Sequence, residues 1–205
     1  MYRPEKYQKD DKDFIFRFIQ ENPFASFIVN GERLLATHIP VLTDGDENSW
    51  RLFSHIANHN EQLEFLKNGA EALVIFLGAH SYISSSWYRK KDISTWDYSA
   101  VHVNAKIKLQ SRGELEDSLG KLVRNFEKDQ ENPLFYNDIP EPMLLEHLPL
   151  ITGFWLEPFK VEGVAKLHQS YPRHDTKAVT EKLDRSGISQ ERDLSEDIKR
   201  ENDIK

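Results

Sequence analysis

Five aromatic side chains share one short stretch of the chain, HSYISSSWYRKKDISTWDYSAVHV, which runs from His80 to Val103. Serine, threonine and histidine lie between them. A hydrophobic core favours aromatic rings without hydroxyls, whereas a plain loop favours hydroxyls without rings. The combination is typical of a site for a flat cofactor with polar edges. The five residues are Tyr82, Trp87, Tyr88, Trp96 and Tyr98.

The stretch LLATHIPV, from Leu34 to Val41, is an apolar strand pattern that Thr37 and His38 interrupt. Consecutive residues of a strand point to opposite faces, so at least one of these polar groups points inward or into a cleft. A partly buried histidine with its hydrogen bonds satisfied is the simpler interpretation of this stretch taken alone.

The stretch LFSHIANHNEQ, from Leu52 to Gln62, predicts a strand that runs directly into a capped helix. Free N–H groups at a helix N-terminus favour a phosphate group. Glu61 in the first turn opposes an anion, so this stretch alone does not establish a phosphate site.

Other kinds of site find little support. The sequence has no G-x-S-x-G motif, and the absence of cysteine excludes thiolate catalysis, disulfides and cysteine-ligated metal. His55 and His59 are four residues apart, but a strand–loop junction separates them and no carboxylate follows at zinc-site spacing. We therefore assign no catalytic and no metal-ligating residue.

The charge of the chain bears on its partners. Among 205 residues, 34 are acidic and 27 are lysine or arginine, giving a formal net charge of −7. Nucleic-acid binding depends on neutralising phosphates, so this charge disfavours direct docking to DNA. The sequence contains no apolar run of about 18 residues, and its first residues lack the apolar segment of a signal peptide. We therefore expect a cytoplasmic protein without membrane contact.

Local patterns predict where helices and strands lie. A helix is expected between Asp13, its predicted N-cap, and Pro23, because the apolar residues between them have helical spacing. The dipeptide Asn30-Gly31 predicts a hairpin between two strands. Further strands are expected in residues 50–57, 71–84, 98–110 and 151–167, and further helices in 58–69, 111–130 and 140–148. The helix in 111–130 begins with the capping-box pattern Ser111 to Glu114.

About six strands joined largely by hairpins, without β-α-β alternation, predict a mainly β (α+β) fold: a small antiparallel barrel with peripheral helices. No G-x-G-x-x-G motif is present, which excludes a dinucleotide-binding Rossmann unit. Residues 1–171 are expected to form the barrel domain. Residues 172–205, rich in charge and poor in aromatic residues, are expected to form a C-terminal helical tail rather than an independent domain.

Six motifs occur together in the order typical of one family. They are MYRPEKY, ATHIPV, HIANHN, FLGAHSYISSSWY, TWDYSAVHV and AKLHQS, spread over residues 1–171. With this set the chain resembles the PaiB-type proteins, which are bacterial FMN-binding, split-barrel regulators of transcription. The resemblance implies a homodimer with a split β-barrel fold, related to flavin reductases and pyridoxamine-phosphate oxidases, in which FMN lies at the dimer interface.

The resemblance also implies roles for particular residues. Ala36, Thr37 and His38 would border the flavin ring, and Trp87, Tyr88, Trp96 and Tyr98 would wall the pocket. The phosphate and ribityl end would be held by Ser54, His55, Ile56, Ala57 and Asn60. Lys166 and Gln169 would reach in from the last strand.

Three functions stay open at this point. The first is an FMN-binding negative regulator of transcription that acts indirectly rather than by docking to DNA. The second is an FMN-dependent oxidoreductase of the flavin reductase and pyridoxamine-phosphate oxidase-like superfamily. The third is an interaction module without flavin, which two departures from the family pattern favour: Asp97, where asparagine is usual, and Glu61, where proline is frequent. A further departure is LHQS in residues 167–170, where the family pattern is LSQN.

Overall fold

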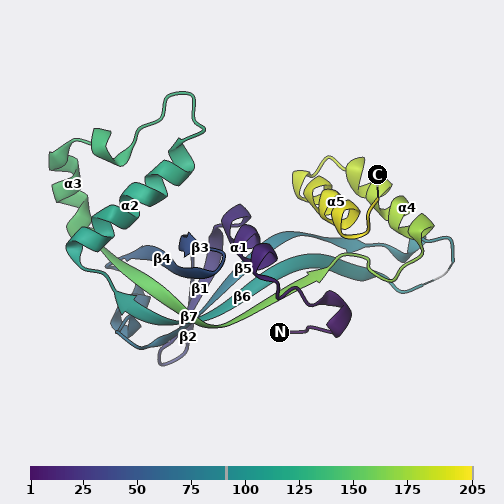
Figure 1. Cartoon of the computed structure of the whole chain (residues 1–205), viewed down its shortest axis with the longest axis horizontal. Helices are drawn as coiled ribbons and strands as arrows, with labels where there is room; N and C mark the ends of the chain where they lie inside the picture. Colours follow the sequence, from purple (N-terminus) through teal and green to yellow (C-terminus); the bar gives the residue numbers. More distant parts are fainter. Residues whose placement is uncertain (91, 205) are drawn as a thin grey trace. The chain divides into compact units, whose positions relative to one another are not determined.

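The structure, a computed structural model, describes residues 1–90 and 92–204; Lys91 of the predicted aromatic loop and Lys205 of the predicted tail lie outside the described residues. Its main element is a seven-stranded antiparallel sheet with the strand order β2-β1-β5-β6-β7-β4-β3 (Figure 1). The strands are β1 (Phe24–Asn30), β2 (Leu34–Pro40), β3 (Leu42–Asp46), β4 (Ser49–Ala57), β5 (Glu71–Ile83), β6 (Thr95–Leu109) and β7 (Ile151–Lys166). The predicted mainly β class is confirmed.

Helices precede the sheet, interrupt it and follow it along the chain. The α-helices are α1 (Lys12–Glu21), α2 (Arg112–Glu127), α3 (Glu141–His147), α4 (Arg173–Asp184) and α5 (Ser189–Glu201). Short 3-10 helices are η1 (Glu5–Tyr7), η2 (Glu61–Phe65), η3 (Ser85–Trp87), η4 (Tyr136–Asp138) and η5 (Leu148–Leu150).

The chain forms two compact units, and each is described by itself. The first unit comprises residues 1–18, 77–102 and 162–205, and the second comprises residues 19–76 and 103–161. The predicted boundary at residue 171 therefore does not coincide with the division between these units, because the tail belongs to the first unit together with the N-terminus.

The second unit contains two hairpins. Asn30 pairs with Leu34, so the predicted hairpin is confirmed and its loop consists of residues 31–33. The other hairpin joins β3 to β4, with Leu42 paired to Phe53. The expectation of about six strands was one too low, because residues 43–49, TDGDENS, have the composition of a turn although they contain most of β3. Gly45 in that strand has φ +121°, a conformation that favours glycine. A glycine between two aspartates is typical of a turn, so the sequence pattern does not indicate a strand here.

Aromatic rings form the core of the second unit. The rings of Phe27 and Phe154 stack with their centroids 4.9 Å apart, and both side chains are buried. Helix α2 begins with the predicted capping box, in which Glu114 N–H donates to the Ser111 hydroxyl and Ser111 N–H donates to the Glu114 carboxylate. The other carboxylate oxygen of Glu114 accepts from Trp155 Nε1 at 3.0 Å, so the cap also fixes the helix to β7.

The N-terminal segment of the first unit lies close to β7. Lys9 N–H donates to the Gly163 carbonyl at 3.1 Å, and Arg3 Nε donates to the same oxygen at 3.1 Å. A Cβ atom at Gly163 would lie 2.1 Å from the Lys9 carbonyl oxygen, so only glycine permits this approach. The motif MYRPEKY thus has a structural role in anchoring the start of the chain.

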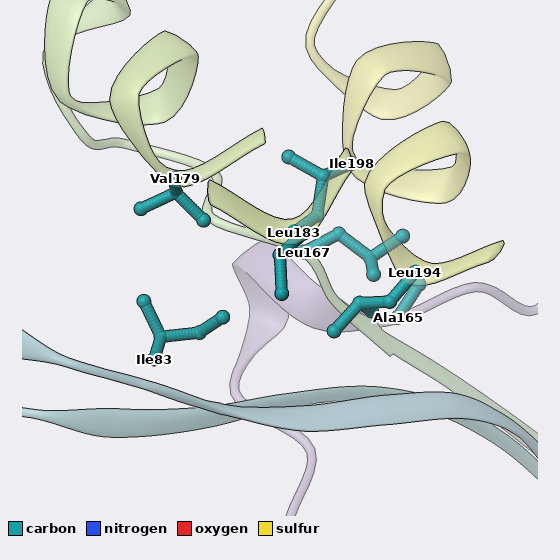
Figure 2. Packing of buried hydrophobic residues seen from close by; sticks show 7 residues of the cluster. All are labelled: Ile83, Ala165, Leu167, Val179, Leu183, Leu194 and Ile198. Atoms are coloured by element: carbon teal, nitrogen blue, oxygen red, sulfur yellow. The ribbon is translucent and has the colours of Figure 1, made fainter. Parts of the chain in front are cut away.

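The two C-terminal helices pack on strand ends of the first unit. Leu183 of α4 and Leu194 of α5 are fully buried against Ile83 of β5 and Ala165 of β7 (Figure 2). Leu167, Val179 and Ile198 complete this cluster, which we call the tail cluster. The charged sequence of the tail thus has a regular apolar face, which the low aromatic content of residues 172–205 does not suggest.

Two local predictions were wrong in detail. The first residue of α1 is Lys12, and Phe14 N–H donates to Asp11 Oδ1 at 2.8 Å, so Asp11 rather than Asp13 satisfies the helix start. The helix expected in residues 58–69 is the single 3-10 helix η2. Of the two asparagines that could cap it, Asn58 and Asn60, the cap is Asn60, whose side chain accepts from Gln62 N–H at 2.9 Å. Within the described part of the chain, none of the helices is long and apolar enough to span a membrane.

Candidate cofactor site

A polar group in the second unit connects β2 to η2. On β2, Leu35 and Ile39 are buried and Thr37 is half-buried on the same face, whereas Ala36 and His38 point to the exposed face. Asn60 Nδ2 donates to Thr37 Oγ1 at 3.0 Å. The Thr37 hydroxyl therefore keeps its own proton to donate, and Asn60 keeps a second amide proton. Two of the predicted residues thus meet as a pair of hydrogen-bond donors.

The buried side-chain amide of Gln62 fixes the position of η2 next to this polar group. Its Nε2 donates to the carbonyls of Phe27 and Leu35 at 3.1 Å each, so it ties η2 to both strands of the first hairpin. Sequence reasoning did not single out Gln62, because a glutamine in a polar segment gives no sign that it is buried.

The predicted residues of β4 alternate between the core and the surface layer. Ser54 and Ile56 are buried, and the Ser54 hydroxyl donates to the Pro40 carbonyl at 2.6 Å. His55 and Ala57 are half-buried on the other face. Burial lowers the pKa of His55 below its ordinary value, so its imidazole is neutral at pH 7 and offers one donor and one acceptor.

Glu61 does not act as a free negative charge. Both of its carboxylate oxygens accept from Arg33 Nη2, at 3.0 and 2.8 Å. The pair is exposed and contributes little to stability, but it offsets the charge that Glu61 adds beside Asn60.

Trp96 is the predicted aromatic residue that is most open to solvent in the first unit. Its side chain is 51% exposed, and its Nε1 donates to His80 Nδ1 at 3.2 Å. Tyr82, on the same face of β5 as His80, is 49% exposed and has its ring centroid 6.4 Å from that of Trp96. The two ring planes are inclined to each other by 58°, so each half-exposed ring offers its own face to solvent. Exposed indole and phenol rings of this kind can bind a planar ring system. We call Trp96, His80 and Tyr82 the aromatic surface.

The other predicted aromatic residues have inward contacts. Trp87 and Tyr88 are half-buried and pack against the tail cluster. Tyr98 packs beside Tyr7, Ala100 and Val164. These contacts give the aromatic stretch a structural task in addition to the predicted one, because the tail helices cover part of it.

Asp97 lies beneath the aromatic surface rather than on it. The side chains of Asp97 and His168 are both almost fully buried, and His168 Nδ1 lies 2.6 Å from Asp97 Oδ2. Lys166 Nζ lies 3.8 Å from the other oxygen of Asp97 and donates to the Trp96 carbonyl at 2.7 Å. Burial lowers the pKa of Lys166, and Asp97 partly opposes that effect.

Gln169 is occupied by contacts within the first unit. Its Nε2 donates to the Ala165 carbonyl at 2.7 Å and to Glu201 at 3.1 Å, and its Oε1 accepts from Leu167 N–H at 2.8 Å. It connects the turn after β7 to the end of α5. Its predicted role toward a cofactor would require these bonds to rearrange.

The predicted residues therefore fall into two groups. Ala36, Thr37, His38, Ser54, His55, Ile56, Ala57 and Asn60 belong to the second unit, and Trp87, Tyr88, Trp96, Tyr98, Lys166 and Gln169 belong to the first. Tyr82 belonged to the predicted aromatic stretch but was given no role toward FMN, and the contact of His80 with Trp96 and the pairing of Asp97 with His168 were not predicted. The alternation of His80 and Tyr82 toward one face of a strand was the signal that could have identified the aromatic surface.

Comparisons with known proteins place this geometry in a family. Residues 1–158 match a family model described as "Putative FMN-binding domain". The protein named Protease synthase and sporulation protein PAI 2, from Bacillus subtilis, is 30% identical over 184 residues, which cover 89% of each chain.

Solved structures share the fold. An FAD- and heme-binding protein from Mycobacterium smegmatis has a TM-score of 0.63 at 15% identity, over 84% of this chain and 80% of its own. A flavocytochrome from Azotobacter vinelandii has a TM-score of 0.61 at 11% identity, over 86% of this chain and 78% of its own. The fold is thus the split barrel of flavin-binding proteins. The chain belongs to the PaiB-type family of FMN-binding proteins.

FMN is the cofactor that this membership assigns to the chain, and the side chains present fit it. The hydroxyl of Thr37 and the amide of Asn60 have protons left to donate to phosphate or ribityl oxygens. The half-exposed Trp96 and Tyr82 suit the flat ring system. Glu61 is paired with Arg33, and the buried carboxylate of Asp97 lies beside both His168 and Lys166, so neither acidic departure presents an unpaired charge to the cofactor. When bound, FMN supplies one- and two-electron redox chemistry.

Proposed function

We propose that the chain is a homodimeric, FMN-dependent negative regulator of transcription that acts through a partner or small molecule rather than by docking to DNA. The curated relative in Bacillus subtilis is named for protease synthesis and sporulation, which supports a regulatory role. The observation that carries the indirect mode is helix α5. The α4–α5 pair, joined by residues 185–188, has the order of a helix-turn-helix, in which the second helix would enter the major groove.

Helix α5 is unsuited to that task. It has five acidic and three basic side chains, and its first-turn residue Glu191 accepts from the Ser81 hydroxyl at 2.8 Å. Its apolar residues Leu194 and Ile198 are buried in the tail cluster. A helix that carries net negative charge is repelled by DNA phosphates. Its contacts stabilise the first unit of the fold instead.

Electrophoretic mobility shift with sheared genomic DNA tests the indirect mode. We expect the FMN-loaded protein to give no shift at moderate salt up to micromolar concentration. The variant Glu191→Lys/Asp193→Lys, which makes α5 basic, serves as a control that the assay detects weak binding. Tight, sequence-selective binding by the unmodified protein would contradict the proposal.

We further propose that the two groups of predicted residues serve different parts of FMN. The hydroxyl and amide of Thr37 and Asn60 would bind the phosphate and ribityl end, and the aromatic surface would contact the ring. Thr37→Val removes the hydroxyl at nearly constant volume and should weaken FMN binding about tenfold, because hydrogen bonds to charged groups contribute about 1.5–3 kcal/mol. Leu34→Ala, an exposed change on the same strand, is the matched control.

Quenching of FMN fluorescence during titration measures these affinities, and light scattering with and without FMN measures the mass in solution. We expect two chains and two flavins per particle. A monomer that binds FMN with the same affinity at all protein concentrations would refute the dimer proposal while leaving flavin binding intact.

A second candidate function is an FMN-dependent oxidoreductase. It is favoured by the exposure of Trp96 and Tyr82, since exposed aromatic rings also admit a planar reductant such as a nicotinamide. Stopped-flow mixing of the FMN-loaded protein with NADH or NADPH decides between the candidates. Bleaching of flavin absorbance at a rate above that of free FMN supports the enzyme, and no acceleration by either donor removes it.

A further inference from the structure

A cleft lies in the second unit, and its wall includes Ala57, which the family resemblance places near the phosphate and ribityl end of FMN. Its volume is about 630 Å³, and its wall comes from helices α2, α3, η4 and η5 together with the end of β4 and the start of β7. Leu119 and Val123 of α2, Leu144 of α3 and Leu148 of η5 are among the residues that line it. This volume lies in the range of small-molecule sites in proteins, about 300–1,000 Å³.

The chemistry of the wall defines what the cleft can accept. It consists of aliphatic side chains with a few polar groups, and no described residue of the wall carries a permanent charge. The two histidines are at its margin: His59 is exposed, and His147 is exposed with its Nδ1 2.8 Å from the Met143 carbonyl. The amide of Asn58 is already bonded to Pro149 and Thr152. An ionised ligand such as a phosphate would find no counter-charge here.

One buried polar atom in the wall lacks a partner. The hydroxyl oxygen of Tyr136 is inaccessible to solvent and makes no hydrogen bond among the described residues. Burial raises the pKa of Tyr136, so this group stays protonated and acts as a donor at neutral pH. A buried donor without an acceptor costs about 1–3 kcal/mol, and a ligand acceptor that displaces the groups covering this hydroxyl would remove that cost.

We propose that this cleft binds a small, uncharged, largely apolar molecule whose single hydrogen-bond acceptor meets the Tyr136 hydroxyl. The site differs in chemistry from the FMN site, which needs donors for a charged phosphate. It goes beyond the proposed function and does not depend on FMN being bound. A second copy of the chain is the competing occupant, and the experiment separates the two.

Nile red is a suitable probe, because it is uncharged, planar and apolar and carries a carbonyl acceptor. We expect saturable binding of one probe per chain, with a blue shift and a rise in emission well separated from flavin fluorescence. Val123→Trp fills the cleft from α2 and should lower the affinity at least tenfold. Tyr136→Phe removes only the donor and should lower it about fivefold.

Leu145→Asn on α3 is the matched control, since Leu145 is 60% exposed and is not part of the wall. It should leave the affinity unchanged, and all variants should keep the wild-type melting temperature within a few degrees. Equal binding by wild type, Val123→Trp and Tyr136→Phe, or no saturable binding, would overturn the proposal. If Val123→Trp changes the mass in solution and the probe binds only the dissociated chain, the occupant is a second copy and the proposal fails.

FMN titration of the same variants distinguishes effects on the FMN site from effects on the cleft. Val123→Trp should bind FMN as the wild type does. Failure of the wild type to bind FMN would contradict the proposed function alone, whereas failure of the probe experiment would contradict only the cleft proposal.

Discussion

His168 Nδ1 lies 2.6 Å from Asp97 Oδ2, and the two side chains, 71 residues apart in the sequence, are almost completely buried. Both residues depart from the motif pattern that the chain resembles, in which asparagine and serine are usual at these positions. The structure brings the two departures into contact. The carboxylate at residue 97 therefore has the imidazole at residue 168 as its partner.

A double-mutant cycle tests this compensation. His168→Ser leaves the buried carboxylate without its nearest partner and should lower the free energy of unfolding by about 3 kcal/mol, because removing one member of a buried pair leaves the other without compensation. In Asp97→Asn/His168→Ser the loss should be at least about 1 kcal/mol smaller than the sum of the single losses. Urea denaturation measures all four proteins. Additive losses would show that the two residues are independent.

Substitution of Trp96 should affect mainly FMN affinity, whereas substitution of Trp87 should affect mainly the stability of the fold. Trp96→Ala removes a half-exposed ring and should change the free energy of unfolding by less than about 0.5 kcal/mol, while weakening FMN binding about tenfold. Trp87→Ala removes a ring packed on the tail cluster and should lower the free energy of unfolding by about 2 kcal/mol. Urea denaturation and FMN titration on both variants give the comparison. Equal effects of the two changes on FMN affinity would contradict the assignment of the aromatic surface.

Two glycines should respond oppositely to alanine. In Gly163→Ala the new Cβ would meet the Lys9 carbonyl at 2.1 Å, so the N-terminal segment must shift and the melting temperature should fall by several degrees. Gly120 lies inside α2 with open space around its Cβ position, and Gly120→Ala should raise the free energy of unfolding by about 0.5–1 kcal/mol. Limited proteolysis of Gly163→Ala should cut first near residues 1–10. An unchanged cleavage pattern would count against the anchoring role.

Glu114 should contribute stability that depends on pH. Hydrogen bonds from the Ser111 backbone, from Trp155 and from the Ser111 hydroxyl lower the pKa of Glu114 from 4.5 to about 2 in the folded protein. Its contribution is therefore complete above about pH 4.5 and is lost as pH falls toward 2. Glu114→Gln should melt below the wild type at pH 7, and the difference should shrink between pH 4.5 and 2. A difference independent of pH would mean that the charge of Glu114 has no part in the cap.

Local signals in the sequence were sufficient for much of the fold. The Asn30-Gly31 hairpin and the Ser111–Glu114 capping box are read from neighbours within four residues, and both are confirmed. The wrong choice of Asp13 over Asp11 has the same origin, since two aspartates only two residues apart offer the same side chain and only the backbone decides which one accepts.

The site features that were missed depend on distant parts of the chain. No local pattern indicates that Asp97 meets His168, or that Trp87 packs against helices that begin 86 residues later at Arg173. The partial burial of Trp87, which distinguishes it from Trp96, comes from its contact with the tail cluster. Aromatic content identified the stretch, but only the tertiary structure shows which of its rings are packed and which are exposed.

The tail cluster has a consequence for how the chain matures. Ile83, Ala165 and Leu167 are covered by residues of α4 and α5, which are synthesised after them. Until α5 has left the ribosome, these three side chains lack their cover, and a product terminated before α4 would keep them exposed to water. Such a fragment would be recognised by chaperones and proteases that survey newly made proteins, so survival in the cell depends on translation continuing through α5.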